Sequence, residues 1–158
     1  MTSISALKYI HKPGLFGNHE NKNEESLLKV SEIQNLLIVQ IVQYKNSTFS
    51  FENIDIDSLK LKNDPLGVIS NNDTRILWNG PKNWLLVSTK KDLLKNILQT
   101  FKETDFAVTD LSHSRAIIEI EGEDAIEVLK KGCPFNFNTL DNNNSINSTY
   151  NGIAFTLD

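Results

Sequence analysis

The sequence has little of what small proteins use for covalent or metal-based stability. Its 158 residues include a single cysteine, Cys133, so an internal disulfide is impossible and a cysteine-based metal site is not expected. No apolar run approaches the roughly 20 residues that cross a membrane. The N-terminus also lacks the basic start and continuous apolar stretch of a signal peptide. We therefore expect a soluble, cytoplasmic protein stabilised by an ordinary hydrophobic core.

The charge balance is mildly acidic. Sixteen lysines and arginines face 20 aspartates and glutamates, for a formal net charge of −4, and no basic stretch is long enough to follow a phosphate backbone. These features argue against binding to nucleic acid or to an anionic membrane. The length suits one domain, or at most two very small ones. We expect residues 1–30 to form an N-terminal arm or loop and residues 31–158 to form a single domain.

Strand and helix patterns are mixed along the chain in the approximate order β-β-α-β-β-α-β. This order, without strict alternation, predicts an α+β fold with a mixed or antiparallel sheet and helices on one face. A short strand is expected around Phe49 and Phe51, whereas residues 55–62 fit either a helical turn or a strand edge. The clearer strands are one at 35–44, a hairpin of 75–78 and 84–87 with a loop of about five residues, a pair at 106–111 and 116–121, and a last strand at 150–157. A first helix is expected at 91–102, capped by Ser88 or Thr89. A second helix is expected at 123–131; it buries Ala125, Ile126 and Leu129 and ends at Gly132.

Nucleophile patterns are weak in this sequence. Cys133 follows the end of a predicted helix, where the dipole disfavours a thiolate, so we expect a buried structural role. His113 lies between two serines, but adjacent residues on an extended chain point to opposite faces, which favours a turn over a Ser–His dyad.

Metal and phosphate patterns are weak as well. The only histidines, His11, His19 and His113, have no metal-ligand spacing, and the turn before the second helix carries Glu123 and Asp124, which would repel a phosphate. We expect no catalytic, cofactor-binding or metal-binding residues in this chain.

Two tryptophans, Trp78 and Trp84, flank the predicted hairpin loop. Tryptophan fills cores, and it is also enriched at the energetic centres of protein interfaces. The sequence leaves both interpretations open.

Several short motifs together resemble the gamma subunit of heterotetrameric sarcosine oxidase. Residues 78–87, WNGPKNWLLV, are similar to its W-x-G-P-x-x-W-L-L segment. Residues 110–115 resemble D-x-S-x-x-R, residues 122–125 G-x-x-A, and residues 129–134 L-x-K-G-C-P, in the same order. Residues 12–15 match a Ser-Pro-Leu segment loosely. The resemblance covers roughly residues 70–140.

The resemblance implies the fold of the folate-binding domain of glycine-cleavage aminomethyltransferases. It also implies membership in an oxidoreductase complex of sarcosine catabolism and one-carbon metabolism, which converts sarcosine, oxygen and tetrahydrofolate to glycine, hydrogen peroxide and methylenetetrahydrofolate. FAD, FMN, NAD and folate are then expected in the alpha and beta subunits and zinc in the delta subunit. This chain would be a non-catalytic assembly subunit. Its candidate interface residues are Trp78, Trp84, His113 and Arg115.

Two alternatives stay open. A free-standing folate-binding or aminomethyltransferase-like protein would need a carboxylate for the pterin and cations for the glutamate tail, and only Arg75 and Arg115 are available besides lysines, so we expect no folate site. An unrelated α+β interaction domain is the other alternative. Members of the resembled family continue past the counterpart of residues 150–157 into an R-S-F-A-like motif, so we expect a shortened variant or a truncated sequence.

Overall fold

The computed structural model describes residues 5, 7–17 and 27–158, which group into two compact units. Residues 18–26 of the predicted arm lie outside the described residues. The units do not follow the expected boundary after residue 30, and the division into an arm and one domain stays a prediction. The first unit comprises Met1–Gln34, His113–Thr139 and Asn147–Leu157, and the second comprises Asn35–Ser112, Leu140–Ile146 and Asp158.

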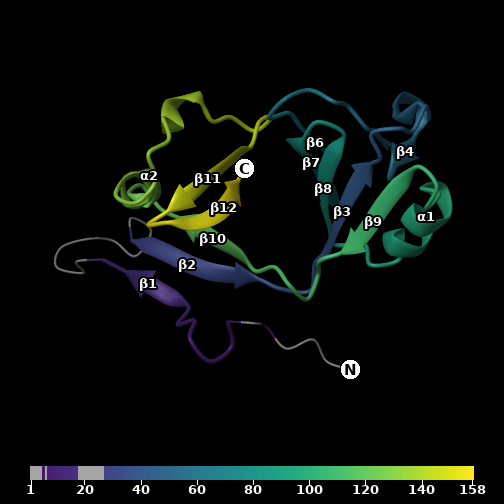
Figure 1. Ribbon diagram of the computed structural model, residues 1–158. Helices are drawn as coiled ribbons and strands as arrows, with labels where there is room; N and C mark the ends of the chain where they lie inside the picture. Colours follow the sequence, from purple (N-terminus) through teal and green to yellow (C-terminus); the bar gives the residue numbers. More distant parts are fainter. Residues whose placement is uncertain (1–4, 6, 18–26) are drawn as a thin grey trace. The chain divides into compact units, whose positions relative to one another are not determined.

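The second unit is built on a five-stranded antiparallel sheet in the order β6-β7-β8-β3-β9 (Figure 1). Its strands are β3 (Leu37–Gln43), β6 (Val68–Ser70), β7 (Thr74–Gly80), β8 (Asn83–Ser88) and β9 (Phe106–Asp110). The predicted strand at 35–44 is confirmed as β3, whose β-branched residues suit a buried strand. The predicted hairpin is confirmed as β7 and β8, with a connection of two residues instead of about five.

One face of this sheet carries the main core. Register places Leu86 opposite both Val39 and Ile76, so the three side chains share a face, and each is at most 2% exposed. The helix α1 (Leu93–Thr100) packs Leu93 and Ile97 into the same cluster. A helix on one face of an antiparallel sheet confirms the predicted α+β class.

The start of α1 differs from the prediction. Its N-cap residue is Asp92, which makes no side-chain capping bond. Ser88, one of the two expected caps, is buried, and its hydroxyl lies 2.8 Å from that of Thr74. The reason is that β8 continues through Ser88. Its hydroxyl also accepts the Lys90 backbone N–H at 3.1 Å, but Lys90 precedes the N-cap residue, so this bond does not cap the helix.

A small hairpin covers more of the core face. It consists of β4 (Asp55–Ile56) and β5 (Leu59–Lys60). Its two turn residues, Asp57 and Ser58, have φ of 52° and 66°, the left-handed pair that a two-residue hairpin turn requires. Of the two readings left open for residues 55–62, the strand reading is therefore correct.

The expected strand around Phe49 and Phe51 is wrong. Phe51 begins a short 3-10 helix, η2 (Phe51–Asn53). Its ring packs on Trp84 with centroids 4.8 Å apart, whereas the ring of Phe49 packs on Phe106 at 5.6 Å. The two rings contact aromatic residues of different strands, Trp84 in β8 and Phe106 in β9.

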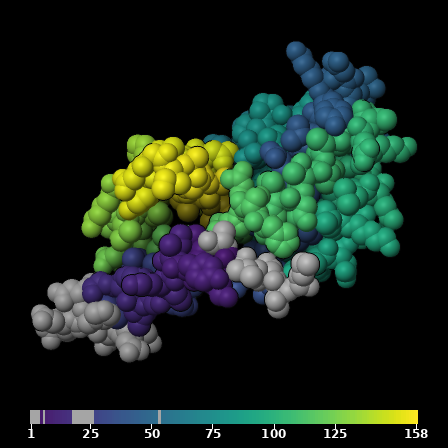
Figure 2. Space-filling model, turned by 60° about the horizontal axis from the view of Figure 1, so that its bottom comes forward, coloured from purple at the N-terminus to yellow at the C-terminus, as the bar shows by residue number. Residues whose placement is uncertain are grey.

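The first unit contains a three-stranded sheet in the order β1-β2-β10 and a two-stranded sheet of β11 and β12. Its elements are β1 (Gly14–Phe16), β2 (Leu28–Ile33), β10 (Ile117–Glu121), α2 (Ala125–Lys130), η3 (Phe137–Thr139), β11 (Ile146–Tyr150) and β12 (Ile153–Leu157). The strand β1 lies inside the predicted arm. Figure 2 shows this N-terminal segment, in purple, on the outside of the unit.

Two strand predictions are corrected in this part of the chain. The strands at 106–111 and 116–121 do not pair with each other, because β9 pairs with β3 and β10 pairs with β2. The expected last strand, 150–157, is two strands that meet at Asn151 and Gly152, whose φ values are 48° and 85°. Asn-Gly is the strongest sequence signal for a two-residue hairpin turn, and it marks the break.

Both α-helices are short, with eight residues in α1 and six in α2. In α2 the predicted buried face is not found, since Ala125 and Leu129 are half-buried and Ile126 is 48% exposed. Gly132 follows the helix, as predicted, but it does not have the left-handed conformation that is common at this position. Its lack of a side chain matters for packing instead, because a Cβ there would lie 2.7 Å from the ring of Tyr150. Within the described ranges, no helix is long and apolar enough to span a membrane.

Replacing Leu86 with alanine tests the core assignment. Leu86 is fully buried, so we expect the Leu86→Ala variant to lose about 3 kcal/mol of unfolding free energy in urea titrations followed by circular dichroism. The matched control is Leu98→Ala, because Leu98 is 55% exposed on α1 and its truncation should cost less than about 1 kcal/mol. Equal losses in the two variants would contradict the assignment.

Candidate functional site

Trp78 and Trp84 face each other across the β7–β8 hairpin. Directly opposed residues of an antiparallel pair point to the same side of the sheet, so both rings lie on the core face. Trp84 is 1% exposed, whereas Trp78 is half-buried. For Trp84 the structure supports core packing. Contact with a partner stays a prediction for both tryptophans.

The loop that follows β5 is held by both tryptophans. The Trp84 Nε1–H donates to the Lys62 carbonyl oxygen at 2.6 Å, and the Trp78 Nε1–H donates to Asn63 Oδ1 at 3.0 Å. The same Asn63 oxygen accepts the Lys82 backbone N–H at 3.1 Å. Further along, Gly67 O accepts the Trp78 backbone N–H at 2.9 Å. These bonds fix residues 62–67 against the end of the hairpin.

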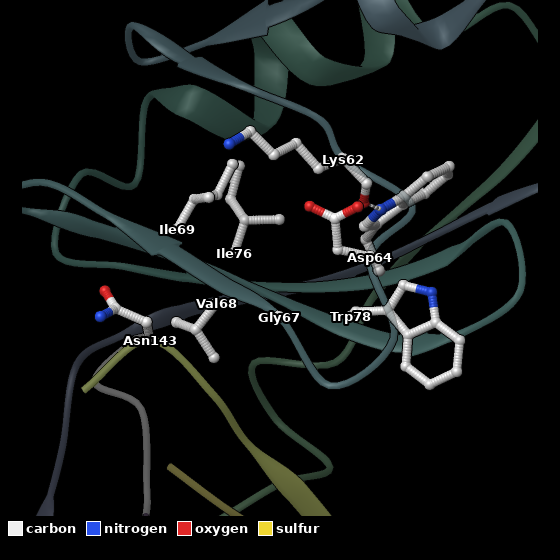
Figure 3. Close-up of a pocket in the computed structure, with 9 residues that line it drawn as sticks. Lys62, Asp64, Gly67, Val68, Ile69, Ile76, Trp78 and Asn143 are labelled. Carbon is white, nitrogen blue, oxygen red and sulfur yellow. Dashed lines mark hydrogen bonds between the residues drawn. The ribbon is translucent and has the colours of Figure 1, made fainter. Parts of the chain in front are cut away.

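A cavity of about 330 Å³ lies beside this loop. Its apolar wall comes from β6, β7 and β8, and its polar side chains come from the loop and from Asn143 (Figure 3). The lining residues are Lys62, Asp64, Gly67, Val68, Ile69, Ile76, Trp78, Trp84 and Asn143. We call this cavity the tryptophan pocket. All of its residues belong to the second unit.

The tryptophan pocket has binding groups and lacks a nucleophile–base pair among its lining residues. Lys62 and Asp64 supply one charge of each sign, Asn143 supplies an amide, and the indoles and isoleucines supply apolar surface. Within the residues that the structure describes, no three His, Cys, Asp or Glu side chains are grouped so that they could hold a metal ion. The pocket is therefore suited to recognition of a small group. Sequence reasoning found its two tryptophans and missed Lys62, Asp64 and Asn143, which have no motif.

His113 and Arg115, the other predicted interface residues, belong to the first unit, and both side chains are exposed. They lie in the connection between β9 and β10. Exposure is compatible with contact to a partner, and that role stays a prediction.

The D-x-S motif has a structural explanation. Asp110 Oδ1 accepts the backbone N–H and the hydroxyl of Ser112 at 2.9 and 2.6 Å. The Ser112 hydroxyl oxygen in turn accepts the Ile38 N–H at 3.0 Å, and the Leu111 N–H donates to the Ile38 carbonyl at 2.8 Å. Ser112 is thus engaged in a turn that ends the β3–β9 pairing, as the sequence favoured over a Ser–His dyad.

The glycines and the cysteine of the remaining motifs are packing residues. Gly122 has φ of 124°, and a Cβ there would lie 2.8 Å from the Leu27 carbonyl oxygen. Cys133 is 3% exposed, and its sulfur lies 3.2 Å from the Ser148 hydroxyl. The expected buried structural role of Cys133 is confirmed.

A charged network joins the β4–β5 turn to the far end of the hairpin. Lys90 Nζ lies 2.8 Å from Asp57 Oδ1 and 3.0 Å from Asp73 Oδ2, and Thr74 Oγ1 donates to Asp57 at 2.7 Å. The hydrogen bond from Lys90, followed by that from Thr74, lowers the pKa of Asp57 from its ordinary 3.8 to about 2. The bond to Asp57 raises the pKa of Lys90.

The sequence comparison and the structure comparison both found a sarcosine oxidase. The sequence is 37% identical over 62 residues to sarcosine oxidase subunit gamma of Corynebacterium sp. (strain U-96). The chain thus resembles sarcosine oxidase gamma subunits. The matched segment covers 39% of this chain and spans 30% of the length of that curated relative. No protein-family model matches the sequence.

The fold agrees with the gamma-subunit resemblance. A chain of heterotetrameric sarcosine oxidase from Corynebacterium sp. U-96, solved in complex with pyrrole 2-carboxylate, superimposes with a TM-score of 0.72 at 23% identity. The superposition covers 84% of this chain and 70% of that one. At this identity the match concerns the fold, and it confirms the α+β architecture expected from the motifs.

Replacing Asn63 tests how the loop is held. The Asn63→Ala variant removes the oxygen that accepts two N–H groups, and we expect a loss of about 1 kcal/mol in urea unfolding. Asn63→Asp keeps an acceptor oxygen and should lose less. The control is Asn142→Ala, at another exposed loop asparagine, which should stay near the wild-type value. An Asn63→Ala variant with the unfolding free energy of the wild type would contradict the anchoring role.

Lowering the pH tests the Asp57 network. Because folding lowers the pKa of Asp57, its ionised form stabilises the native state above pH 4, and this contribution is lost as the pH falls from about 4 to about 2. We expect the difference in Tm between wild type and Asp57→Asn to be largest above pH 4 and to narrow below it. Asparagine suits the left-handed turn position, so a constant difference across this range would contradict the electrostatic cause.

Proposed function

We propose that this chain is a gamma-type subunit of a heterotetrameric sarcosine oxidase complex with a structural role in assembly. The local 37% identity to a sarcosine oxidase gamma subunit carries the proposal, and the shared fold supports it. In this proposal the flavins, NAD, folate and zinc are bound by the alpha, beta and delta partners, and the complex acts on sarcosine or a related N-methyl amine.

The distribution of apolar side chains also supports an assembly role. Of the 20 buried apolar residues in the described ranges, three, Leu27, Cys133 and Phe137, belong to the first unit. The same unit exposes most of the large apolar side chains that face solvent, namely Tyr9, Ile10, Leu15, Phe16, Ile33, Ile118, Ile126 and Ile153. A unit with a small core and many exposed apolar groups is typical of a subunit that partners cover.

The contacts of three residues in the shared motifs also favour a structural role for the chain over a catalytic one. Ser112, Gly122 and Cys133 are used for a turn, a close backbone approach and a buried contact. Of the two arginines available for a folate tail, Arg75 lies 2.8 Å from the Asp158 carboxylate. The free-standing folate-binding alternative therefore gains no support.

Co-purification tests the proposal. A tagged chain expressed in its native cell should retain flavin-containing partner subunits through size-exclusion chromatography. An Ile118→Ser, Ile153→Ser double variant should retain a smaller share of them, because both side chains are exposed on the first unit, at 49% and 74%. Leu98→Ser, on the second unit, is the matched control.

Two results would contradict this function. One is recovery of the wild-type chain without any flavoprotein partner. The other is tight, stoichiometric binding of tetrahydrofolate by the purified chain, which would support the folate-binding alternative.

A further inference from the structure

The tryptophan pocket has an apolar wall that continues the core. Ile69 and Ile76 are opposed across the β6–β7 pair, on the same face as Trp84, whose ring is buried in the main cluster. Residues of the β4–β5 hairpin and of α1 pack into the same cluster, and the edge strand β6 supplies part of the pocket lining. A cavity of about 330 Å³ is in the size range of sites for small organic molecules.

Two opposite charges line the same pocket. Figure 3 shows the Lys62 side chain extending over Ile69 and Ile76, with the Asp64 carboxylate turned toward the same side. Other charged residues nearby are paired, as Lys90 is with Asp57. Within the described part of the chain, the ammonium of Lys62 and the carboxylate of Asp64 have no ion-pair or hydrogen-bond partner.

The residue between these charges is held in place. Asn63 is bonded to Trp78 and Lys82, and the Lys62 carbonyl is bonded to Trp84. The backbone that carries both charges is thus fixed before any ligand arrives, which reduces the entropy that binding must overcome. A positive and a negative group on a fixed loop beside an apolar wall match a ligand with both charges and an apolar body.

We propose that the tryptophan pocket binds a free α-amino acid with an aromatic or branched apolar side chain. The ligand ammonium pairs with Asp64, its carboxylate pairs with Lys62, and its side chain packs on Ile69, Ile76 and the indoles. A purely anionic ligand would leave its charge beside Asp64, and a purely cationic one would lie beside Lys62. This inference goes beyond the assembly role and does not depend on it.

Titration of the full chain with L-phenylalanine tests the proposal. The sequence contains two tryptophans, and both line the pocket, so their fluorescence reports occupancy. We expect a Kd of about 1 mM or tighter. Phenethylamine and 3-phenylpropionate keep the ring and lose one charge each, and both should bind about tenfold more weakly, as loss of one charge-assisted contact implies.

Paired variants assign the charges. Asp64→Asn should weaken phenylalanine binding about tenfold and should not weaken 3-phenylpropionate binding, whereas Lys62→Met should weaken phenylalanine binding similarly and should not weaken phenethylamine binding. The controls are Asp55→Asn and Lys60→Met, at exposed positions of β4 and β5 that do not line the pocket; both should bind as the wild type does.

Three results would overturn the inference. The first is no change in fluorescence at about 10 mM phenylalanine, a concentration well above the expected Kd. The second is equal affinity for the three probes, and the third is a phenylalanine affinity that is unchanged in both charge variants. None of these results bears on whether the chain co-purifies with flavoprotein partners, so failure here and failure of the assembly role are separate outcomes.

Discussion

Burial of one face of the five-stranded sheet is the interaction on which the second unit depends. Val39, Ile76 and Leu86 come from three neighbouring strands and are almost completely removed from water. At about 25 cal/mol per Å² of apolar surface, such contacts supply the dominant favourable term in folding. The helix α1, the β4–β5 hairpin and the turn at Phe51 all take their positions by covering this face.

The buried indole N–H of Trp84 needs a hydrogen-bond acceptor, and this need determines the position of the neighbouring loop. A buried indole N–H without an acceptor costs about 1–3 kcal/mol, and the Lys62 carbonyl oxygen meets this requirement for Trp84 at 2.6 Å. Once Lys62 is fixed, Asn63 reaches Trp78 and the hairpin loop. The walls of the tryptophan pocket therefore follow from the way the core satisfies its own hydrogen bonds.

The motifs shared with sarcosine oxidase gamma subunits have structural roles in this chain. Ser112 joins the end of β9 to β3, Gly122 allows the chain to approach Leu27, and Gly132 leaves room for the ring of Tyr150. These three residues hold the backbone in place and do not line the pocket, whereas Trp78 and Trp84 of the W-x-G-P-x-x-W segment do. A sequence resemblance carried by the positions that hold the backbone is a resemblance of fold first.

The sequence by itself determined the elements whose pattern is local. β-Branched content and turn residues located β3 and the β7–β8 hairpin, helical spacing located α1, and Cys133 was correctly expected in the interior. Only the tertiary structure decided that β9 pairs with β3 while β10 pairs with β2, that Ser88 bonds Thr74 instead of capping α1, and that Lys62 and Asp64 line a pocket with Trp78. The hydrophobic period of a strand predicts which of its faces is buried, but it does not identify the strand or loop that packs against it. Those partners are far away in the sequence and are selected by tertiary packing.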